Sequence, residues 1–170
     1  MVSLLNSMPC DEFNVLYDML ENISISIKKG ESSRRGFGAH RATTFGMVRG
    51  RYNGILGLSH SSHKYPDIYK EILRIGSLID MKFNAIHLNH NVVCPKHLDS
   101  NNYGDSVLIS FGEYEGCNIV IEDKKYDAFC QPIKFDGSKL YHWNTNDLIG
   151  NKYSLVFYYN KSLPDLTRLC

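Results

Sequence analysis

The order of apolar and polar residues predicts two helices in the first half of the chain. Residues 10–23 carry apolar side chains at the spacing of one helix face, behind Asp11 and Glu12, which suit the start of a helix. A second helix is predicted to begin at Pro66, because proline fits the first helical turn and isoleucines then recur along one face. These isoleucines are Ile68, Ile72, Ile75 and Ile79. Such a stripe favours packing of this helix on a sheet.

From Met81 onward the pattern changes to short apolar runs separated by turn residues, which is typical of β-strands. The runs cover residues 83–90, 105–111, 117–122, 128–135, 139–143 and 152–160. Asp136-Gly137 between two of them indicates a hairpin. The sequence therefore predicts one α+β, mainly β domain over residues 1–170, with residues 1–80 supporting a core of strands at 81–160. We expect an antiparallel sandwich or jelly roll with the helices on one side.

The segment between the predicted helices is rich in glycine, serine and arginine, which favours a loop or ragged hairpin over residues 28–54. Short strands are predicted on either side of this loop, at residues 24–27 and 54–60. Between Lys28 and Arg51, seven basic side chains accompany a single acidic one, so this stretch carries a charge of +6 within a chain of net charge +1. The rest of the chain therefore carries −5.

Two interpretations of this basic stretch stay open. It is a solvated surface loop, or it binds a phosphate-rich partner such as nucleic acid. Phe37, Phe45 and the neighbouring Tyr52 add possible stacking surfaces to its charge, which supports nucleic-acid binding. On that interpretation, five arginines are expected to contact phosphate: Arg34, Arg35, Arg41, Arg49 and Arg51.

Composition restricts the class of protein further. Apolar residues make up 43% and charged residues 22% of the sequence, as in an ordinary globular protein, and no apolar run is long enough to span a membrane. The first residues lack the pattern of a signal peptide, so we expect a soluble intracellular protein of the cytoplasm or nucleus. The five cysteines are odd in number and contain no C-x-x-C, which favours reduced thiols over a disulfide framework or a zinc ribbon.

A candidate metal site lies between two of the predicted strands, at His97-Leu98-Asp99. In an extended segment the imidazole and the carboxylate project to the same face, because they are two residues apart. A second imidazole would complete the two-histidine, one-carboxylate set of non-haem iron(II) enzymes, and His142 in a later predicted strand can supply it. The alternative is a surface turn in which Asp99 caps a backbone N–H.

Lys152 and Ser154 open the last predicted strand and share one of its faces. An ammonium and a hydroxyl placed in this way can bind one carboxylate of a ligand. A cation in an otherwise apolar strand is costly without a partner, so Lys152 is expected to meet an anion. The alternative is an edge-strand lysine that protects the sheet from aggregation.

These motifs together resemble the iron(II)/2-oxoglutarate dioxygenase superfamily, and in detail its TET/JBP-like branch. The resemblance rests on H-x-D at 97–99, N-x-G-x-S at 102–106, G-x-Y-x-G at 112–116, FDG with YH at 135–142, and KYSLVF at 152–157. It covers roughly residues 34–160 and implies a double-stranded β-helix, a cupin-like jelly roll. Two positions depart from the pattern. Lys152 replaces the closing arginine, and Cys117 replaces the second glycine of a Gly-Gly turn, which puts the backbone of that turn in doubt.

The resemblance implies roles for particular residues. It implies His97, Asp99 and His142 as ligands of Fe(II), and Lys152, Ser154 and Asn89 as the binding site of 2-oxoglutarate, which reacts with O2. Asn91, Tyr103 and Ser106 are expected at the substrate pocket. The implied activity is hydroxylation of a pyrimidine methyl group, 5-methylcytosine or thymine, in nucleic acid and most simply in DNA.

Three other functions remain open at this point. A protein hydroxylase of the prolyl type shares the superfamily and also carries a lysine ten residues after the histidine. A non-catalytic cupin-like binding module would keep the fold without the chemistry. A zinc hydrolase could use the same three ligands but leaves Lys152 and Ser154 without a role.

Overall fold

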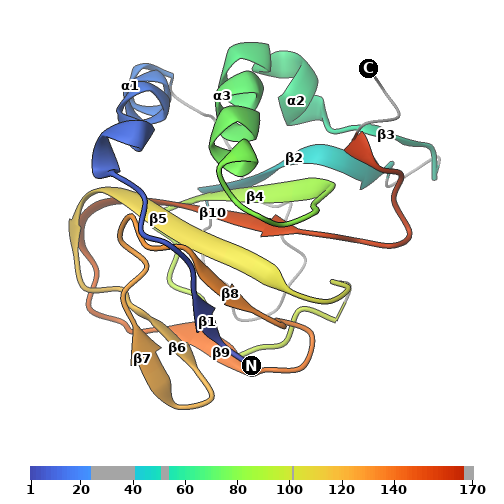
Figure 1. The fold of residues 1–170 in the computed structure, drawn as a ribbon. Helices are drawn as coiled ribbons and strands as arrows, with labels where there is room; N and C mark the ends of the chain where they lie inside the picture. Colours follow the sequence, from blue (N-terminus) through green and yellow to red (C-terminus); the bar gives the residue numbers. More distant parts are fainter. Residues whose placement is uncertain (24–40, 51–53, 101, 167–170) are drawn as a thin grey trace.

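Strand pairing divides the chain into a large and a small antiparallel sheet in the computed structural model, which describes residues 1–23, 41–50, 54–100 and 102–166 (Figure 1). The small sheet has three short strands, in the order β7 (Lys124–Tyr126), β6 (Ile119–Ile121) and β9 (His142–Asn144). The large sheet has seven strands, in the order β1 (Ser3–Leu4), β8 (Ile133–Phe135), β5 (Ser106–Glu115), β10 (Ile149–Tyr158), β4 (Ala85–His90), β2 (Arg41–Arg49) and β3 (Leu56–Leu58).

The helices cover one face of the large sheet, and the small sheet lies on the other side (Figure 1). They are a 3-10 helix, η1 (Cys10–Phe13), and the α-helices α1 (Asn14–Asn22), α2 (His60–Lys64) and α3 (Pro66–Ser77). Helix α3 starts at the proline and buries the predicted isoleucine stripe, since Ile68, Ile72 and Ile75 are at most 1% exposed. The predicted class is confirmed: a mainly β jelly roll with helices on one side.

The central strands of the large sheet present different chemistry on their two faces. Leu155 and Phe157 of β10 enter the core beneath the helices, together with Ile86 and Leu88 of β4. Because successive strand residues alternate in direction, Lys152 and Ser154 of β10 face the small sheet. We call this side, which carries the polar residues of β4, β5 and β10, the inner face.

The structure corrects the loop or ragged hairpin predicted over residues 28–54, because the described part of this segment includes a long, regularly paired strand. Residues 41–49 form β2, which pairs with β4 on one side and β3 on the other. Phe45 and Met47 of this strand are fully buried, so packing outweighs a composition that resembles a loop. Of the two short strands predicted beside this loop, the one at 54–60 is present as β3, and the one at 24–27 lies outside the described residues.

The Asp136-Gly137 hairpin is also a wrong prediction. Strand β8, before this turn, belongs to the large sheet, whereas β9, after it, belongs to the small sheet. The turn is stabilised locally, because the Asp136 carboxylate accepts hydrogen bonds from the N–H and hydroxyl of Ser138, at 3.1 and 2.6 Å. It therefore connects two layers instead of two paired neighbours.

One pair of cysteines contradicts the expectation of reduced thiols. Cys10 and Cys130 form a disulfide that ties η1 to the segment before β8. The Met8 N–H donates to the Cys130 carbonyl at 2.9 Å, so the backbone already holds the two segments together. In the part of the chain that the structure describes, Cys94 and Cys117 lie outside any disulfide. Within that part, none of the helices is long and apolar enough to cross a membrane.

Gly76 of α3 allows a direct test of how this helix packs on the sheet. A methyl group there would lie 2.5 Å from Phe83 Cζ and 2.9 Å from Phe157 Cε1. On an exposed helix Gly→Ala stabilises by about 1 kcal/mol, but here we expect Gly76→Ala to lower the free energy of unfolding by about 1–3 kcal/mol. Urea denaturation measures the change. The exposed Lys70→Ala of the same helix should stay within about 0.5 kcal/mol, and a stabilised Gly76→Ala would contradict the close packing.

Candidate metal centre

A backbone bridge between two distant segments places the two histidines side by side. The His97 N–H donates to the His142 carbonyl at 3.0 Å, and the His142 N–H donates back to the His97 carbonyl at 3.1 Å. Directly opposed residues of an antiparallel pair project to the same face. The two imidazole rings accordingly lie 4.2 Å apart between centroids.

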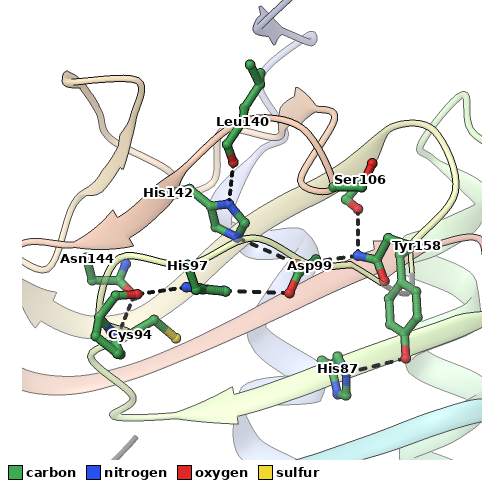
Figure 2. A network of polar contacts seen from close by, with 12 residues as sticks. His87, Cys94, His97, Asp99, Ser106, Leu140, His142, Asn144 and Tyr158 are labelled. Atoms are coloured by element: carbon green, nitrogen blue, oxygen red, sulfur yellow. Dashed lines mark hydrogen bonds and ion pairs between the residues drawn. The ribbon is translucent and has the colours of Figure 1, made fainter. Parts of the chain in front are cut away.

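Asp99 joins this pair through its own backbone anchor. Its N–H donates to the Gly137 carbonyl at 2.8 Å, in the turn that leads to β9. Its carboxylate oxygens lie 3.6 Å from His97 Nε2 and 3.6 Å from His142 Nε2 (Figure 2). The three possible ligand atoms are all within 4.8 Å of one another, which is a suitable arrangement for a single metal ion.

Backbone carbonyls fix which nitrogen of each imidazole faces this point. His97 Nδ1 lies 2.7 Å from the Pro95 carbonyl, and His142 Nδ1 lies 2.9 Å from the Leu140 carbonyl. A carbonyl can only accept, so each Nδ1 carries the proton and each Nε2 presents a lone pair. This is the usual outer support of metal-binding histidines. The donor set of two imidazoles and one carboxylate fits iron(II), with positions left open for other ligands.

Asn102 and Gly137 support this group, although neither was among the predicted site residues. The Asn102 side chain donates to Asp99 Oδ2 at 3.3 Å and to Ser106 Oγ at 3.2 Å. A methyl group on Gly137 would lie 3.3 Å from Asp99 Oδ2 and 3.4 Å from His142 Cε1. Asn102 opens the N-x-G-x-S motif and Gly137 belongs to the FDG motif, so both signals were present in the sequence.

His87 lies on the inner face but is engaged elsewhere. Its Nδ1 lies 3.0 Å from the Thr44 hydroxyl, and its ring stacks on that of Tyr158. Its Nε2 lies 3.3 Å from the Tyr158 hydroxyl (Figure 2). Both nitrogens therefore have protein partners. Of these two histidines, His142 is the one that lies beside His97 and Asp99.

Lys152 is a buried cation, with 5% of its surface exposed. Its ammonium donates to the Cys117 carbonyl at 2.5 Å and lies 5.1 Å from the centre of the Tyr114 ring. No carboxylate of the described residues forms an ion pair with it. A buried ammonium with one carbonyl partner is poorly compensated, because it has three N–H donors and a full charge. Its surroundings favour the binding of an anion.

The other residues predicted at the cosubstrate and substrate sites differ in position and in burial. Ser154 pairs with Asn89 across β10 and β4, and the Asn89 amide lies 3.4 Å from the Ser154 hydroxyl on the inner face. Asn91 is exposed, and its side chain accepts the Lys152 N–H at 2.7 Å, so it ends the pairing of the two strands. Ser106 is fully buried beside Asn102, whereas Tyr103 is 60% exposed.

The structure describes two of the five arginines of the predicted patch, and these two lie at opposite ends of one strand. Arg34, Arg35 and Arg51 lie outside the described residues. Arg41 and Arg49 are the two end residues of β2, and the guanidinium of the exposed Arg49 donates to the Gly54 carbonyl at 3.4 Å. The patch as a whole therefore stays a prediction.

Cys117, which stands in place of the second glycine of the expected Gly-Gly turn, has a left-handed backbone conformation of the kind that glycine adopts easily. Gly116 and Cys117 both have positive φ, at 72° and 50°. The Asp147 carboxylate accepts the Cys117 N–H at 2.7 Å and so holds this conformation. Hydrogen bonds from the Thr145 hydroxyl and from the Cys117 N–H lower the pKa of Asp147, which keeps it charged at neutral pH.

Comparison with known proteins gives a clear fold and no family by sequence. The sequence matches no protein-family model and no curated protein. NgTET1 in complex with 5mC DNA superposes with a TM-score of 0.65 and 14% identity, over 94% of this chain and 72% of that one. A Pseudomonas putida prolyl-4-hydroxylase gives 0.54 and 11%, over 94% and 91%.

A third solved structure is an oxidoreductase of the 2OG-Fe(II) oxygenase family from Burkholderia pseudomallei. It gives a TM-score of 0.55 and 15% identity, over 94% of this chain and 84% of that one. Structures this different in sequence establish the fold alone. The chain therefore has the jelly-roll fold of the 2-oxoglutarate/iron(II) oxygenases, as the resemblance implied.

The tight space at Gly137 predicts a specific effect on metal binding. Gly137→Ala would press a methyl group against Asp99 and His142, so we expect iron(II) affinity to fall about tenfold or more. Calorimetric titration with iron(II) under argon measures this. The matched control is Gly57→Ala, because a methyl group at Gly57 has nothing within 4 Å. Equal affinities in the two variants would show that Gly137 does not shape the site.

Proposed function

We propose that the chain is an iron(II)- and 2-oxoglutarate-dependent dioxygenase. The observation that carries the proposal is the convergence of His97 Nε2, His142 Nε2 and the Asp99 carboxylate on one point. The fold shared with solved 2-oxoglutarate/iron(II) oxygenases supports it. The side chains of His97 and Asp99 are 16% and 17% exposed, so this group of ligands lies close to the protein surface.

The chain also offers a place for the second end of 2-oxoglutarate. This cosubstrate has a 2-oxo acid at one end, which can chelate a metal, and a carboxylate at the other. Lys152 and Ser154 share the inner face, and the buried ammonium gains its missing counter-ion when a carboxylate binds. Bound iron(II) supplies the activation of oxygen coupled to decarboxylation of the cosubstrate. The residues of this chain hold the reactants and fix their orientation.

For the substrate, we propose a pyrimidine methyl group, 5-methylcytosine or thymine, in nucleic acid. The TET/JBP-like motifs support this choice, and so does the likeness to NgTET1, which was solved with 5mC DNA. The +6 stretch between Lys28 and Arg51 would attract the phosphate backbone. An enzyme that acts on a base in a duplex must first take it out of the stack, at a cost of a few kcal/mol.

A protein hydroxylase is the second candidate. The likeness to the Pseudomonas putida prolyl-4-hydroxylase favours it. The TM-score of that structure, 0.54, is lower than the 0.65 of NgTET1. Lys152 also favours it, because a lysine ten residues after the histidine resembles prolyl hydroxylases. A peptide substrate would need no strong affinity for phosphate.

Asp99→Ala tests the proposed reaction. Loss of the carboxylate ligand should lower iron(II) affinity at least a hundredfold and abolish iron-dependent conversion of 2-oxoglutarate to succinate. Calorimetry under argon and chromatographic detection of succinate measure the two effects. The exposed Asp80→Ala serves as the control for loss of a carboxylate elsewhere. Full turnover by Asp99→Ala would place the metal ligand elsewhere, and no turnover by the unchanged protein would favour a binding module.

A mass-shift assay decides between the two substrate classes. The protein is incubated with iron(II), 2-oxoglutarate and either a 5-methylcytosine oligonucleotide or a proline-containing peptide, and mass spectrometry detects the gain of one oxygen atom. We expect the oligonucleotide to gain it.

Charge reversal at Arg34, Arg35, Arg41, Arg49 and Arg51 should weaken DNA binding and reduce its salt dependence. A peptide product, or DNA binding unchanged by the reversal, would contradict the nucleic-acid substrate.

A further inference from the structure

The segment that leads to His97 contains one residue more than the part of β9 to which it is attached. At one end it is held by the backbone hydrogen bonds between His97 and His142. At the other end, the Asn144 N–H donates to the Cys94 carbonyl at 2.9 Å. These attachment points are three residues apart along the segment and two apart along β9. Because a regular antiparallel pair matches residues one to one, the extra residue forms a β-bulge opposite Trp143.

The bulge contains the carbonyl that orients His97. Its two inner residues are Pro95 and Lys96, and proline suits a bulge because it has no N–H to contribute to the ladder. The Pro95 carbonyl accepts a hydrogen bond from His97 Nδ1 at 2.7 Å. The shape of the bulge therefore sets the direction in which His97 Nε2 points, and bulges beside active sites commonly redirect a side chain in this way.

The Asn144 side chain holds the first residue of the bulged segment. Its Oδ1 accepts the Cys94 N–H at 3.1 Å (Figure 2), where a regular ladder would use the Asn144 carbonyl. Asn144 and His142 project to the same face of β9, because they are two residues apart. One strand thus supplies a possible ligand of the metal centre and also holds the segment that carries another.

Lys96 and Trp143 close the bulge on the opposite face of β9. The Lys96 ammonium lies 4.5 Å from the centre of the Trp143 ring and 5.5 Å from that of Tyr141. The Lys96 side chain is 54% exposed, and cation–π contacts at exposed sites are weak. Cys94 and Asn144 are more buried, so we expect their hydrogen bond to contribute more to the shape of the bulge.

We propose that Asn144 is a positioning residue of the metal centre, which keeps the bulge in the shape that directs His97 Nε2 at the metal. The inference rests on the proposed function, because it takes His97, Asp99 and His142 as the metal ligands. It goes further by giving a role in metal binding to a residue outside this set of three. Strand β9 then positions His97 in two ways, through the His97–His142 bonds and through the Asn144 side chain.

Removal of the acceptor oxygen tests this role. Asn144→Ala should lower the affinity for iron(II), measured by calorimetry under argon, about tenfold, because the groups that orient metal ligands typically contribute this much. Asn144→Val removes the same oxygen and favours a strand, so it serves if the alanine variant folds poorly. Asn144→Asp keeps an oxygen in this place and should retain the affinity. The visible absorption spectrum of the cobalt(II)-loaded protein reports ligand geometry, and it should change in the first two variants alone.

The matched control is Asn22→Ala, which removes an exposed amide that donates to the Asp18 carbonyl. It should change neither the iron(II) affinity nor the cobalt(II) spectrum. Urea denaturation of the metal-free variants separates positioning from a role in folding. A lower free energy of unfolding in Asn144→Ala, with affinity and spectrum unchanged, would leave Asn144 a folding role alone and overturn the inference. An equal loss of affinity in Asn144→Asp would also contradict it.

Two further outcomes separate this inference from the proposed function. If the unchanged protein binds iron(II) no more tightly than Asp99→Ala does, the metal centre of the proposed function is wrong. If binding depends on Asp99 and the variants without the Asn144 oxygen keep the affinity and the spectrum, the role of Asn144 is wrong and the proposed function stands.

Discussion

The two backbone hydrogen bonds between His97 and His142 are the constraint on which the site depends. They join the segment after β4 to β9. The backbone alone therefore fixes the positions of two of the three possible metal ligands. The bond from the Asp99 N–H to Gly137 fixes the third. Because carbonyls also hold the two Nδ1 atoms, the ligand atoms are positioned by main chain throughout. A site built in this way loses little freedom when a metal binds.

The strands of the large sheet serve both the core and the site because their side chains alternate. On β10, Leu155 and Phe157 pack under the helices, while Lys152 and Ser154 lie on the inner face. A register shift of one residue would place the lysine in the apolar core and expose the phenylalanine. The apolar packing on one side thus fixes the position of the polar groups on the other.

Local patterns in the sequence predicted the parts of the fold that depend on local physics. Helix α3 follows from Pro66 and its isoleucines, and the common direction of His97 and Asp99 follows from their spacing. Features that depend on distant partners were not visible. Strand β2 is formed by residues of loop-like composition because β4 and β3 pair with it, and the Cys10–Cys130 disulfide joins residues 120 positions apart. The contact of Tyr114 with Lys152 needs the β5–β10 register, which no single-strand pattern contains.

The substitution at Cys117 shows how the site tolerates a departure from its motif. A non-glycine residue with positive φ costs about 1 kcal/mol or more, yet Cys117 adopts it at 50°. The Asp147 carboxylate binds the Cys117 N–H, and the Cys117 side chain is 1% exposed, so a charge-assisted hydrogen bond and burial offset the strain. The carbonyl of the same residue accepts a hydrogen bond from the Lys152 ammonium. The backbone of Cys117 thus links two charged side chains, because its N–H binds Asp147 and its carbonyl binds Lys152.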